Sequence, residues 1–313
     1  MTVSHVAECP DLGPECLAGE PAPVPYNHHV DQIIAETVFD ASLGITPFFA
    51  IDTRWSLRVA DVNPTYSELD GTPKQVPDDI HHHDETLVDV TDPWLLGRFA
   101  AVQGNFVSVL RVGLSFPVGR TEPDPYALGQ QGKTHEHLQA GSGTVVPIVG
   151  FGLAYRIAPV MISLGGIGFF NGYENDEGFR APTRLYASHR VAVGLFDDVL
   201  VPFVEATLAH ETEEYWSGEV GLEGSNVRSE VYLGGGASWR FYESWSIDAT
   251  VRGRVASLTE APTFTSYGLF SLGVSTSFDL WDTKDELAAG APALEDTPIR
   301  RTEKDGVLEF EKK

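Results

Sequence analysis

The chain has 313 residues, with 45 Asp and Glu residues against 21 Lys and Arg residues, and a formal net charge of -24. This length fits two average domains or one large all-β domain. The acidic balance argues against a nucleic-acid partner, because phosphate binding needs positive charge, and it favours the attraction of cations. No run approaches the roughly 18 apolar residues of a transmembrane helix.

Residues 1–30 read as an N-terminal extension. Their start, MTVSHVAECPDLGPECLAGE, has neither a basic region nor an apolar run, so it does not resemble a signal peptide. Taken alone, this start would indicate a cytoplasmic protein, but the rest of the chain argues against that, and we expect a processed or truncated start. Cys9 and Cys16 lie in a Pro/Gly-rich stretch. They fit either a small disulfide loop in an oxidising compartment or two free thiols.

The segment from 31 to 281 is dominated by alternation with a period of two, which is typical of β-strands. In 245–258, for example, Trp245, Ile247 and Val251 share one face, whereas Asp248 and Arg252 share the other. No comparable helical pattern occurs in this span. The alternation predicts eleven strands, at 32–45, 48–61, 86–101, 106–116, 144–157, 160–171, 183–196, 199–210, 229–241, 245–258 and 265–280.

The connections between these strands alternate between short and long. A bacterial outer-membrane barrel has this arrangement, with tight turns facing the periplasm and long loops facing outward. We therefore predict an all-β, antiparallel, up-and-down transmembrane barrel, with a large soluble lipocalin-like or sandwich protein as the rival. Bacterial barrels usually have even strand numbers. We expect twelve, with the missing strand in 14–30, in the third segment, which Asp92-Pro93 interrupts, or at the chain start.

Charged residues fall on the less apolar row of their strands. A wet lumen tolerates such charges, whereas a dry sandwich core would bear a desolvation cost. The predicted lumen-lining residues are Glu36, Asp40, Asp52, Arg54, Arg58, Arg111, Arg156, Arg184, Arg190, Glu205, Glu230, Arg240, Asp248, Arg252 and Arg254.

Aromatic residues near the strand ends suit the interfacial girdles of such barrels, although ordinary strand aromatics would look the same. They are Tyr155, Phe169, Phe170, Phe196, Trp239, Trp245 and Trp281. Residues 282–313, which follow the last strand, are strongly charged and predict a largely disordered periplasmic tail.

Two stretches carry a resemblance to a known family. In 110–157, a strand ending in Pro-x-Gly (FPVG) leads through a long loop to Gly-Ser-Gly-Thr and the next strand. This segment resembles the transporter-type outer-membrane barrels grouped with phenol-degradation-pathway proteins. The stretch 84–100 is similar to their Gly-x-Gly-Asp-x-Trp-type strand, although Val90 and Thr91 replace the usual glycines. The resemblance implies an outer-membrane channel or transporter of hydrophobic or small solutes, without catalytic residues.

The strand directions place most of the histidines at the outward-facing mouth. Imidazoles and nearby carboxylates are suitable ligands for Zn²⁺ or Cu²⁺, and His135 and His137 would project to one side of an extended segment. The alternative is that polar histidines populate wet loops or respond to pH. The candidate metal ligands are His28, His29, His81, His82, His83, His135, His137, Asp84 and Glu136.

We do not expect an enzyme. Ser188 and His189 are adjacent, so in a strand they face opposite ways, and the chain has no Gly-x-Ser-x-Gly motif. The predicted function is an outer-membrane channel or transporter for a small solute, with a possible metal link through the histidine-bearing mouth. The alternative is a non-conducting surface barrel whose loops bind a metal, a ligand or a partner. The expected partners are the lipid bilayer and the solute or metal ion, and the oligomeric state stays open.

Overall fold

The computed structural model describes residues 2–6, 26–75, 84–131, 133–135, 137–221, 227–242, 244–259, 264–265, 268–278, 302–304 and 307–309. These residues form β-strands and their connections, with one short helix among them, α1 (Pro125–Gln130). No helix in this part of the chain combines the length and the apolar character needed to span a bilayer.

The main sheet contains all eleven expected strand segments as neighbours in chain order, and the described strands pair antiparallel. The third segment is divided into β5 and β6 at Thr91-Asp92-Pro93, where the expected irregularity lies. The bounds are β1 (Thr2–Val6), β2 (Tyr26–Thr46), β3 (Phe49–Glu68), β5 (Glu85–Val90), β6 (Trp94–Gln103), β7 (Phe106–Ser115), β8 (Val146–Ile157), β9 (Val160–Phe169), β11 (Arg184–Val193), β12 (Leu200–Glu211), β15 (Arg228–Tyr242), β16 (Trp245–Ser257), β17 (Phe264–Thr265) and β18 (Gly268–Thr276).

Shorter strands lie in the connections. The strand β4 (Pro73–Lys74) pairs with β3, and β10 (Phe179–Arg180), β13 (Tyr215–Trp216) and β14 (Glu219–Val220) form a small sheet of their own. Two further strands, β19 (Thr302–Lys304) and β20 (Val307–Glu309), pair within the C-terminal tail. The disorder predicted for 282–313 otherwise concerns residues outside the described part of the chain.

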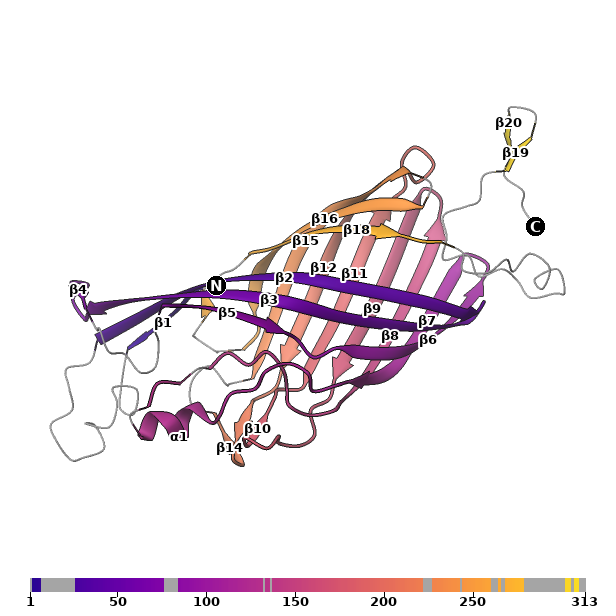
Figure 1. The fold of residues 1–313 in the computed structure, drawn as a ribbon. Coiled ribbons are helices and arrows are strands. Elements are labelled where there is room, and N and C mark those ends of the chain that lie inside the picture. Colours follow the sequence, from indigo (N-terminus) through magenta and orange to yellow (C-terminus); the bar gives the residue numbers. More distant parts are fainter. Residues whose placement is uncertain are drawn as a thin grey trace.

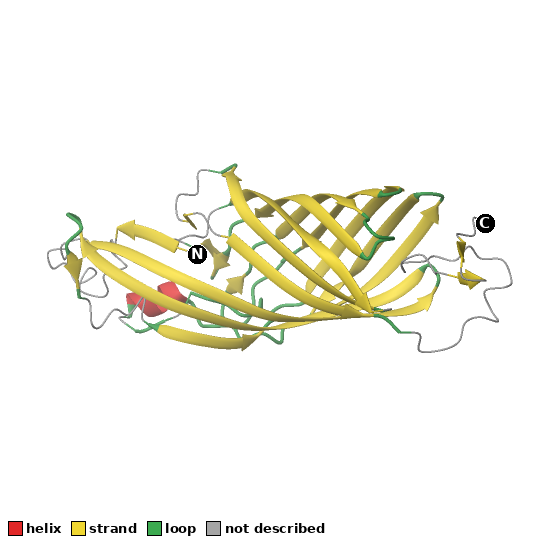
Figure 2. Cartoon of the chain, turned by 90° about the horizontal axis from the view of Figure 1, so that it is seen from above, coloured by secondary structure: helices red, strands yellow, loops and turns green. Residues whose placement is uncertain are grey.

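The long connections gather at one end of the barrel and the short turns at the other (Figures 1 and 2). The helix α1 and the short strands β4, β10 and β14 lie at the first end, which we call the mouth. The opposite end, which we call the turn rim, carries short turns such as Ala158-Pro159. This separation is the arrangement predicted from the spacing of the strands.

The outward face of the wall is an apolar belt. Val204, Leu233 and Phe270 project from it and are 64%, 52% and 75% exposed, and similar side chains occur along most strands. Apolar side chains on the inward rows are more often buried, for example Ala50 on β3 and Ile148 on β8. A soluble protein does not expose a continuous apolar surface of this extent, whereas lipid covers it. The soluble lipocalin-like or sandwich interpretation is therefore wrong.

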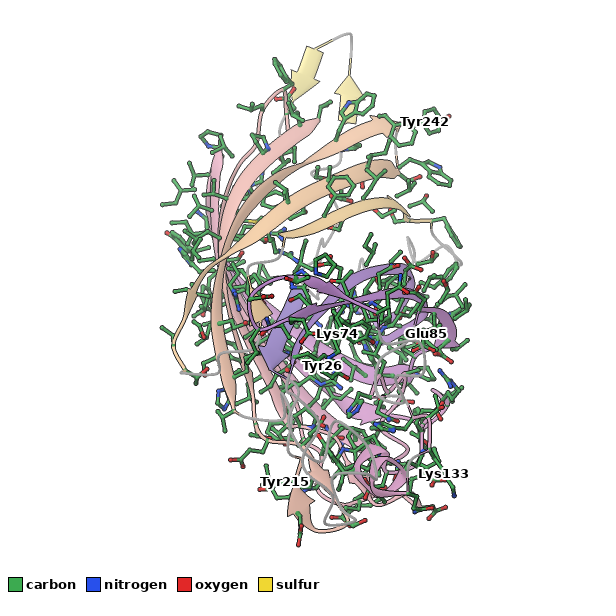
Figure 3. The ribbon with its side chains drawn as sticks, turned by 90° about the vertical axis from the view of Figure 1, so that its left-hand side faces the viewer. Tyr26, Lys74, Glu85, Lys133, Tyr215 and Tyr242 are labelled. Carbon is green, nitrogen blue, oxygen red and sulfur yellow. The ribbon has the colours of Figure 1, made fainter. Side chains whose placement is uncertain are left out.

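Aromatic side chains follow the turn rim. Phe196, Trp239, Tyr242 and Trp245 lie at or beside short turns and are between 42% and 77% exposed. Figure 3 shows Tyr242 at the margin of the wall, away from the loops marked by Lys133 and Tyr215. This position is typical of an interfacial aromatic girdle. Of the other predicted aromatics, Tyr155, Phe169 and Phe170 also end strands, and Trp281 lies outside the described residues.

The short strand β1 adds to the eleven segments. It pairs with β2 on one side and on the other with β17, which shortly precedes β18 in the chain. Between β1 and the turn rim, the described wall has two edges, the strands β2 and β18. There β2 pairs with β3, and β18 pairs with β16. The twelfth strand expected in 14–30 falls mostly on residues outside the described part, although β2 begins earlier than predicted, at Tyr26.

Candidate functional site

Inward-facing ion pairs line the wall formed by β2 and β3. Arg54 Nε donates to Asp40 Oδ1 at 2.6 Å, and Arg58 Nε donates to Glu36 Oε1 at 2.7 Å. Both pairs are direct cross-strand neighbours in the β2–β3 register, which is the geometry in which opposite charges stabilise a sheet. The sequence predicted all four residues as lumen-lining, and the structure brings them together in pairs.

Asp52 connects this wall to β6 and β7. Arg98 and Arg111 face each other directly across the β6–β7 pair, and two like charges in this position repel. Asp52 offsets the repulsion, because its Oδ2 lies 3.1 Å from Arg98 Nε and 3.5 Å from Arg111 Nε. We call these three residues the Asp52 triad. Arg98 was not predicted, although it lies on the inward row of its strand.

A second triad is built around Glu205 on β12. Arg190 Nη2 donates to Glu205 Oε2 at 2.7 Å from β11, and Arg252 Nε donates to Glu205 Oε1 from β16. The strand β15 lies between β12 and β16, and there Gly234 is opposite both Glu205 and Arg252. A Cβ at Gly234 would lie only 2.7 Å from Cγ of Arg252. The glycine therefore leaves the space through which Arg252 reaches Glu205.

Nearer the mouth, Glu230 is buried against Arg254 and Tyr232. Arg254 Nη1 donates to Glu230 Oε1 at 2.7 Å, and the Tyr232 hydroxyl donates to the other oxygen. Arg228 binds Glu211 at the same end of the neighbouring strands, at 2.5 Å. Glu211 and Arg228 were not predicted, because the alternating segments in the sequence stop one residue short of each.

The remaining predicted lumen residues differ in their contacts. Arg156 binds the Asp198 carboxylate at the turn rim, and Arg240 Nη2 donates to the backbone oxygen of Asp198 at 2.7 Å. Arg184 lies on the inward row at the mouth end of β11, and its buried Nε has no hydrogen-bond acceptor in the described structure. Asp248 is on the inward row of β16, and no ion pair joins it to another described residue.

These inward charges remain accessible to solvent. The side chains of Arg54 and Arg190, which face the interior from different parts of the wall, are 48% and 39% exposed. A lumen filled by side chains would bury them, and charges buried in this number would carry a large desolvation penalty. The interior therefore has room for water beside the ion pairs.

The connection between β7 and β8, residues 116–145, folds back toward the barrel and is held by Asp92. We call it the inner loop. The Val118 and Gly119 N–H groups donate to Asp92 Oδ1 at 3.0 and 2.8 Å, and the Ser142 N–H and hydroxyl donate to Oδ2 at 2.7 and 2.8 Å. Gly119 and Gly141 cross closely there, since a Cβ on Gly119 would lie 2.7 Å from the Gly141 Cα. One carboxylate thus clamps both ends of the inner loop.

This clamp unites the motifs that carried the family resemblance. Asp92 belongs to the Asp-x-Trp stretch, Gly119 to the Pro-x-Gly stretch and Ser142 to the Gly-Ser-Gly-Thr stretch. The sequence therefore contained the signal for Asp92. The role of Asp92 depends on a contact with Ser142, which lies fifty residues farther along the chain and meets Asp92 at the break between β5 and β6. The sequence pattern alone does not show this contact.

The inner loop continues along the inner wall below the mouth. Arg120 Nε donates to Asp89 of β5 at 2.8 Å, and Arg58 Nη1 reaches the backbone oxygen of Gln139 at 3.5 Å. Leu138 and Leu87 line a small cavity between the inner loop and the strands β2, β3 and β5. The inner loop therefore occupies part of the cross-section on the mouth side of the lumen.

Three connections pack together at the mouth. The rings of Phe179 and Trp216 pack at a tilt of 36°, with centroids 4.6 Å apart. They form a small core with Ala181, against which Tyr126 of the inner loop packs. The Asn175 amide nitrogen donates to the backbone oxygen of Ser142 at 3.4 Å. In Figure 3, Lys133 and Tyr215 mark this group of loops on one side of the mouth, apart from Tyr26, Lys74 and Glu85.

The histidines come together only in part. His135 is buried, its Nδ1 lies 2.9 Å from the Lys133 oxygen, and its ring centroid is 5.1 Å from that of His137. His29 Nε2 lies 3.7 Å from Asp31, and Asp84 is exposed beside β5. His28 is described by its backbone within β2, whereas His81, His82, His83 and Glu136 lie outside the described residues. Among the residues described, no three His, Cys, Asp or Glu side chains are placed to share a metal ion.

No family model matches the chain, and no curated protein matches it by sequence. Among solved structures, it is similar to an outer membrane channel from Pseudomonas putida F1, with a TM-score of 0.51, 11% identity and coverage of 80% of this chain and 82% of that one. OmpT, an outer membrane protein of Vibrio cholerae, matches with a TM-score of 0.34 and 10% identity over 79% and 96% of the two chains. The likeness to the Pseudomonas putida channel indicates the same fold as the apolar belt and the charged interior do. The chain has the β-barrel fold of bacterial outer-membrane proteins.

Proposed function

We propose that the barrel is a channel through which a small solute crosses the outer membrane. The observation that carries this proposal is the set of inward-facing ion pairs that remain exposed to solvent. Arg54, Arg190 and Arg156 are 48%, 39% and 40% exposed while they face the interior from three separate strands. A hydrated interior of this kind supports the passage of water-soluble molecules.

The inner loop limits the size of the solute in this proposal. It takes up part of the lumen beside Arg58 and Asp89, and the Asp92 clamp holds it at both ends. A clamped loop inside a barrel of this size leaves a narrow path. We therefore propose a small solute, and we propose no catalytic role, since Ser188 and His189 project to opposite faces of β11.

The test is the conductance of the purified, refolded protein in planar bilayers. In a background of Cys9→Ser and Cys16→Ser, Leu87→Cys and Leu138→Cys would tether the inner loop to the wall through a disulfide. We expect single-channel openings in the untethered protein and a smaller or less fluctuating conductance after oxidation, restored by a reductant. The single-cysteine variants are the matched controls. A folded protein without conductance in either state would contradict the channel.

A metal link remains a second candidate, favoured by the close His135–His137 pair. Two imidazoles fit a Zn²⁺ or Cu²⁺ site that takes further ligands from the mouth. Conductance with and without Zn²⁺, in the native sequence and in His137→Gln, tests it. A zinc effect that persists in His137→Gln would exclude this pair.

The alternative is a non-conducting barrel whose loops bind a partner, and the packed group of loops around Phe179 and Trp216 favours it. An ordered loop surface can present a fixed binding face. A folded protein that does not conduct, and that still binds a ligand or partner through this surface, would support this alternative over the channel.

A further inference from the structure

We propose that the lumen selects for small anions, and that the Asp52 and Glu205 triads set this preference. The inference rests on the proposed channel function and specifies the class of solute. It runs against the net charge of the chain, -24, which taken alone suggests that the protein concentrates cations.

Each triad contains one carboxylate and two guanidinium groups, so each carries an excess of one positive charge. The carboxylates are the more deeply buried members. Glu205 is 3% exposed, whereas the Arg190 and Arg252 side chains that bind it are 39% and 34% exposed. An ion in the lumen therefore meets the guanidinium groups before it meets the carboxylate.

The Asp52 triad repeats this arrangement. The Asp52 side chain is 14% exposed, and Arg111, which faces Arg98 across β6 and β7, is 37% exposed. Arginine keeps its charge at every pH at which a barrel functions, so the excess does not titrate away. Both triads thus present positive charge to the same interior.

The triads lie on opposite walls and at similar depth. Asp52 is on β3 and Glu205 is on β12, which are six steps apart in the strand order β2-β3-β6-β7-β8-β9-β11-β12-β15-β16-β18. Each is a few residues from the turn rim, since β3 begins at Phe49 and β12 begins at Leu200. A solute that has passed the inner loop must therefore cross the space between them.

The other charges at this depth do not cancel the excess. Asp40 and Arg54 neutralise each other, and Asp198 carries one negative charge beside both Arg156 and Arg240. Asp248 adds one negative charge on β16. With these included, arginines still outnumber carboxylates in the half of the lumen next to the turn rim. A narrow passage with low-dielectric walls strengthens the effect of such an excess on passing ions.

Small anions with carboxylate or phosphate groups suit this passage. Guanidinium groups bind such oxyanions through paired N–H donors, and their planar shape favours this geometry over that of a simple halide. Cations would be attracted to the acidic loops of the mouth but would meet positive charge on both walls farther in.

The experiment measures the reversal potential of the full chain in planar bilayers under a KCl gradient, and then with acetate or phosphate replacing chloride. We expect anions to be more permeant than K⁺ in the native protein. In the double variant Arg111→Gln/Arg190→Gln, the anion-to-cation permeability ratio should fall by about fourfold for each charge removed. One charge at about 10 Å in water changes the permeability of the anion and of the cation by about twofold each, in opposite directions. Asp52→Asn and Glu205→Gln should each raise the ratio.

Two controls separate charge from structure. Arg111→Lys/Arg190→Lys keeps the charges and should retain the anion preference even if stability falls. Arg54→Gln/Asp40→Asn removes a neutral pair at similar depth and should leave the ratio unchanged. Cation preference in the native protein, or an unchanged ratio in the folded Arg111→Gln/Arg190→Gln variant, overturns the inference while the channel stands. Absence of any conductance overturns both proposals.

Discussion

Removal of the Asp92 carboxylate should release the inner loop. Asp92 accepts four hydrogen bonds at 2.7 to 3.0 Å from the two ends of this loop. A hydrogen bond to a charged group contributes about 1.5 to 3 kcal/mol, and water can replace part of it in a wet lumen. With about 1 kcal/mol retained for each bond, Asp92→Ala makes docking of the loop less favourable by about 4 kcal/mol. This raises the population of the undocked loop about a thousandfold.

Asp92→Asn gives an intermediate result. The amide keeps one acceptor oxygen, so about half of the docking energy is lost, and the undocked population rises about thirtyfold. Two assays follow the loop: the fluctuation of single-channel conductance, and the rate at which a thiol reagent modifies Leu138→Cys in the cysteine-free background. Both should increase in the order native, Asp92→Asn, Asp92→Ala.

The matched control is Asp61→Asn, which changes a carboxylate on β3 that binds Thr86 and Asn63 and does not touch the inner loop. It should leave conductance and labelling unchanged. The reasoning fails if the Asp92→Ala variant shows the native rate of thiol labelling and the native fluctuation of conductance, because the clamp would then contribute nothing to docking.

Three further predictions concern the wall and the mouth. Gly234→Val fills the space that leads to Glu205 and should lower the free energy of unfolding by about 1 to 3 kcal/mol, measured by urea titration in lipid vesicles, with Gly234→Ala less affected. Val204→Arg places a charge in lipid and should cost about 2 to 4 kcal/mol, whereas Thr207→Arg on the inward row should cost less; equal losses would contradict the assignment of the two faces. Trp216→Ala removes the centre of the loop core and should speed proteolysis at the mouth while heat-modifiable gel mobility of the barrel is retained.

The strands could be predicted because lipid and lumen impose opposite requirements on alternate residues. Val251 and Arg252 are neighbours in sequence, and the requirement for an apolar outside and a polar inside is sufficient to place both. The pairs Asp40–Arg54 and Glu36–Arg58 follow once the two-residue turn and the register shift between Gly44 and Thr46 fix the register of β2 and β3. Local pattern and register thus account for the wall and for most of its inward charges.

The contacts that depend on long-range folding could not be predicted. Asp92 was recognised only as an interruption of a strand, because its partners lie in a loop whose path has no periodicity. Arg120 could not be predicted for the same reason, although it binds Asp89 on the inner wall. The proximity of His135 and His137 was expected from their spacing, but whether the other histidines join them stays a prediction.

The two edges of the described wall have a consequence for its strand number. An odd number of antiparallel segments makes β2 and β18 run in the same direction, so they cannot complete an antiparallel ladder with each other. Backbone groups left unpaired in hydrocarbon each cost several kcal/mol. A strand that satisfied both edges would have to run from the turn rim toward the mouth, which is the direction of β1, antiparallel to β2. The five residues of β1 near the mouth thus already run in the direction that a closing strand between β2 and β18 would need. Such a strand, continued to the turn rim, would give the barrel an even number of strands.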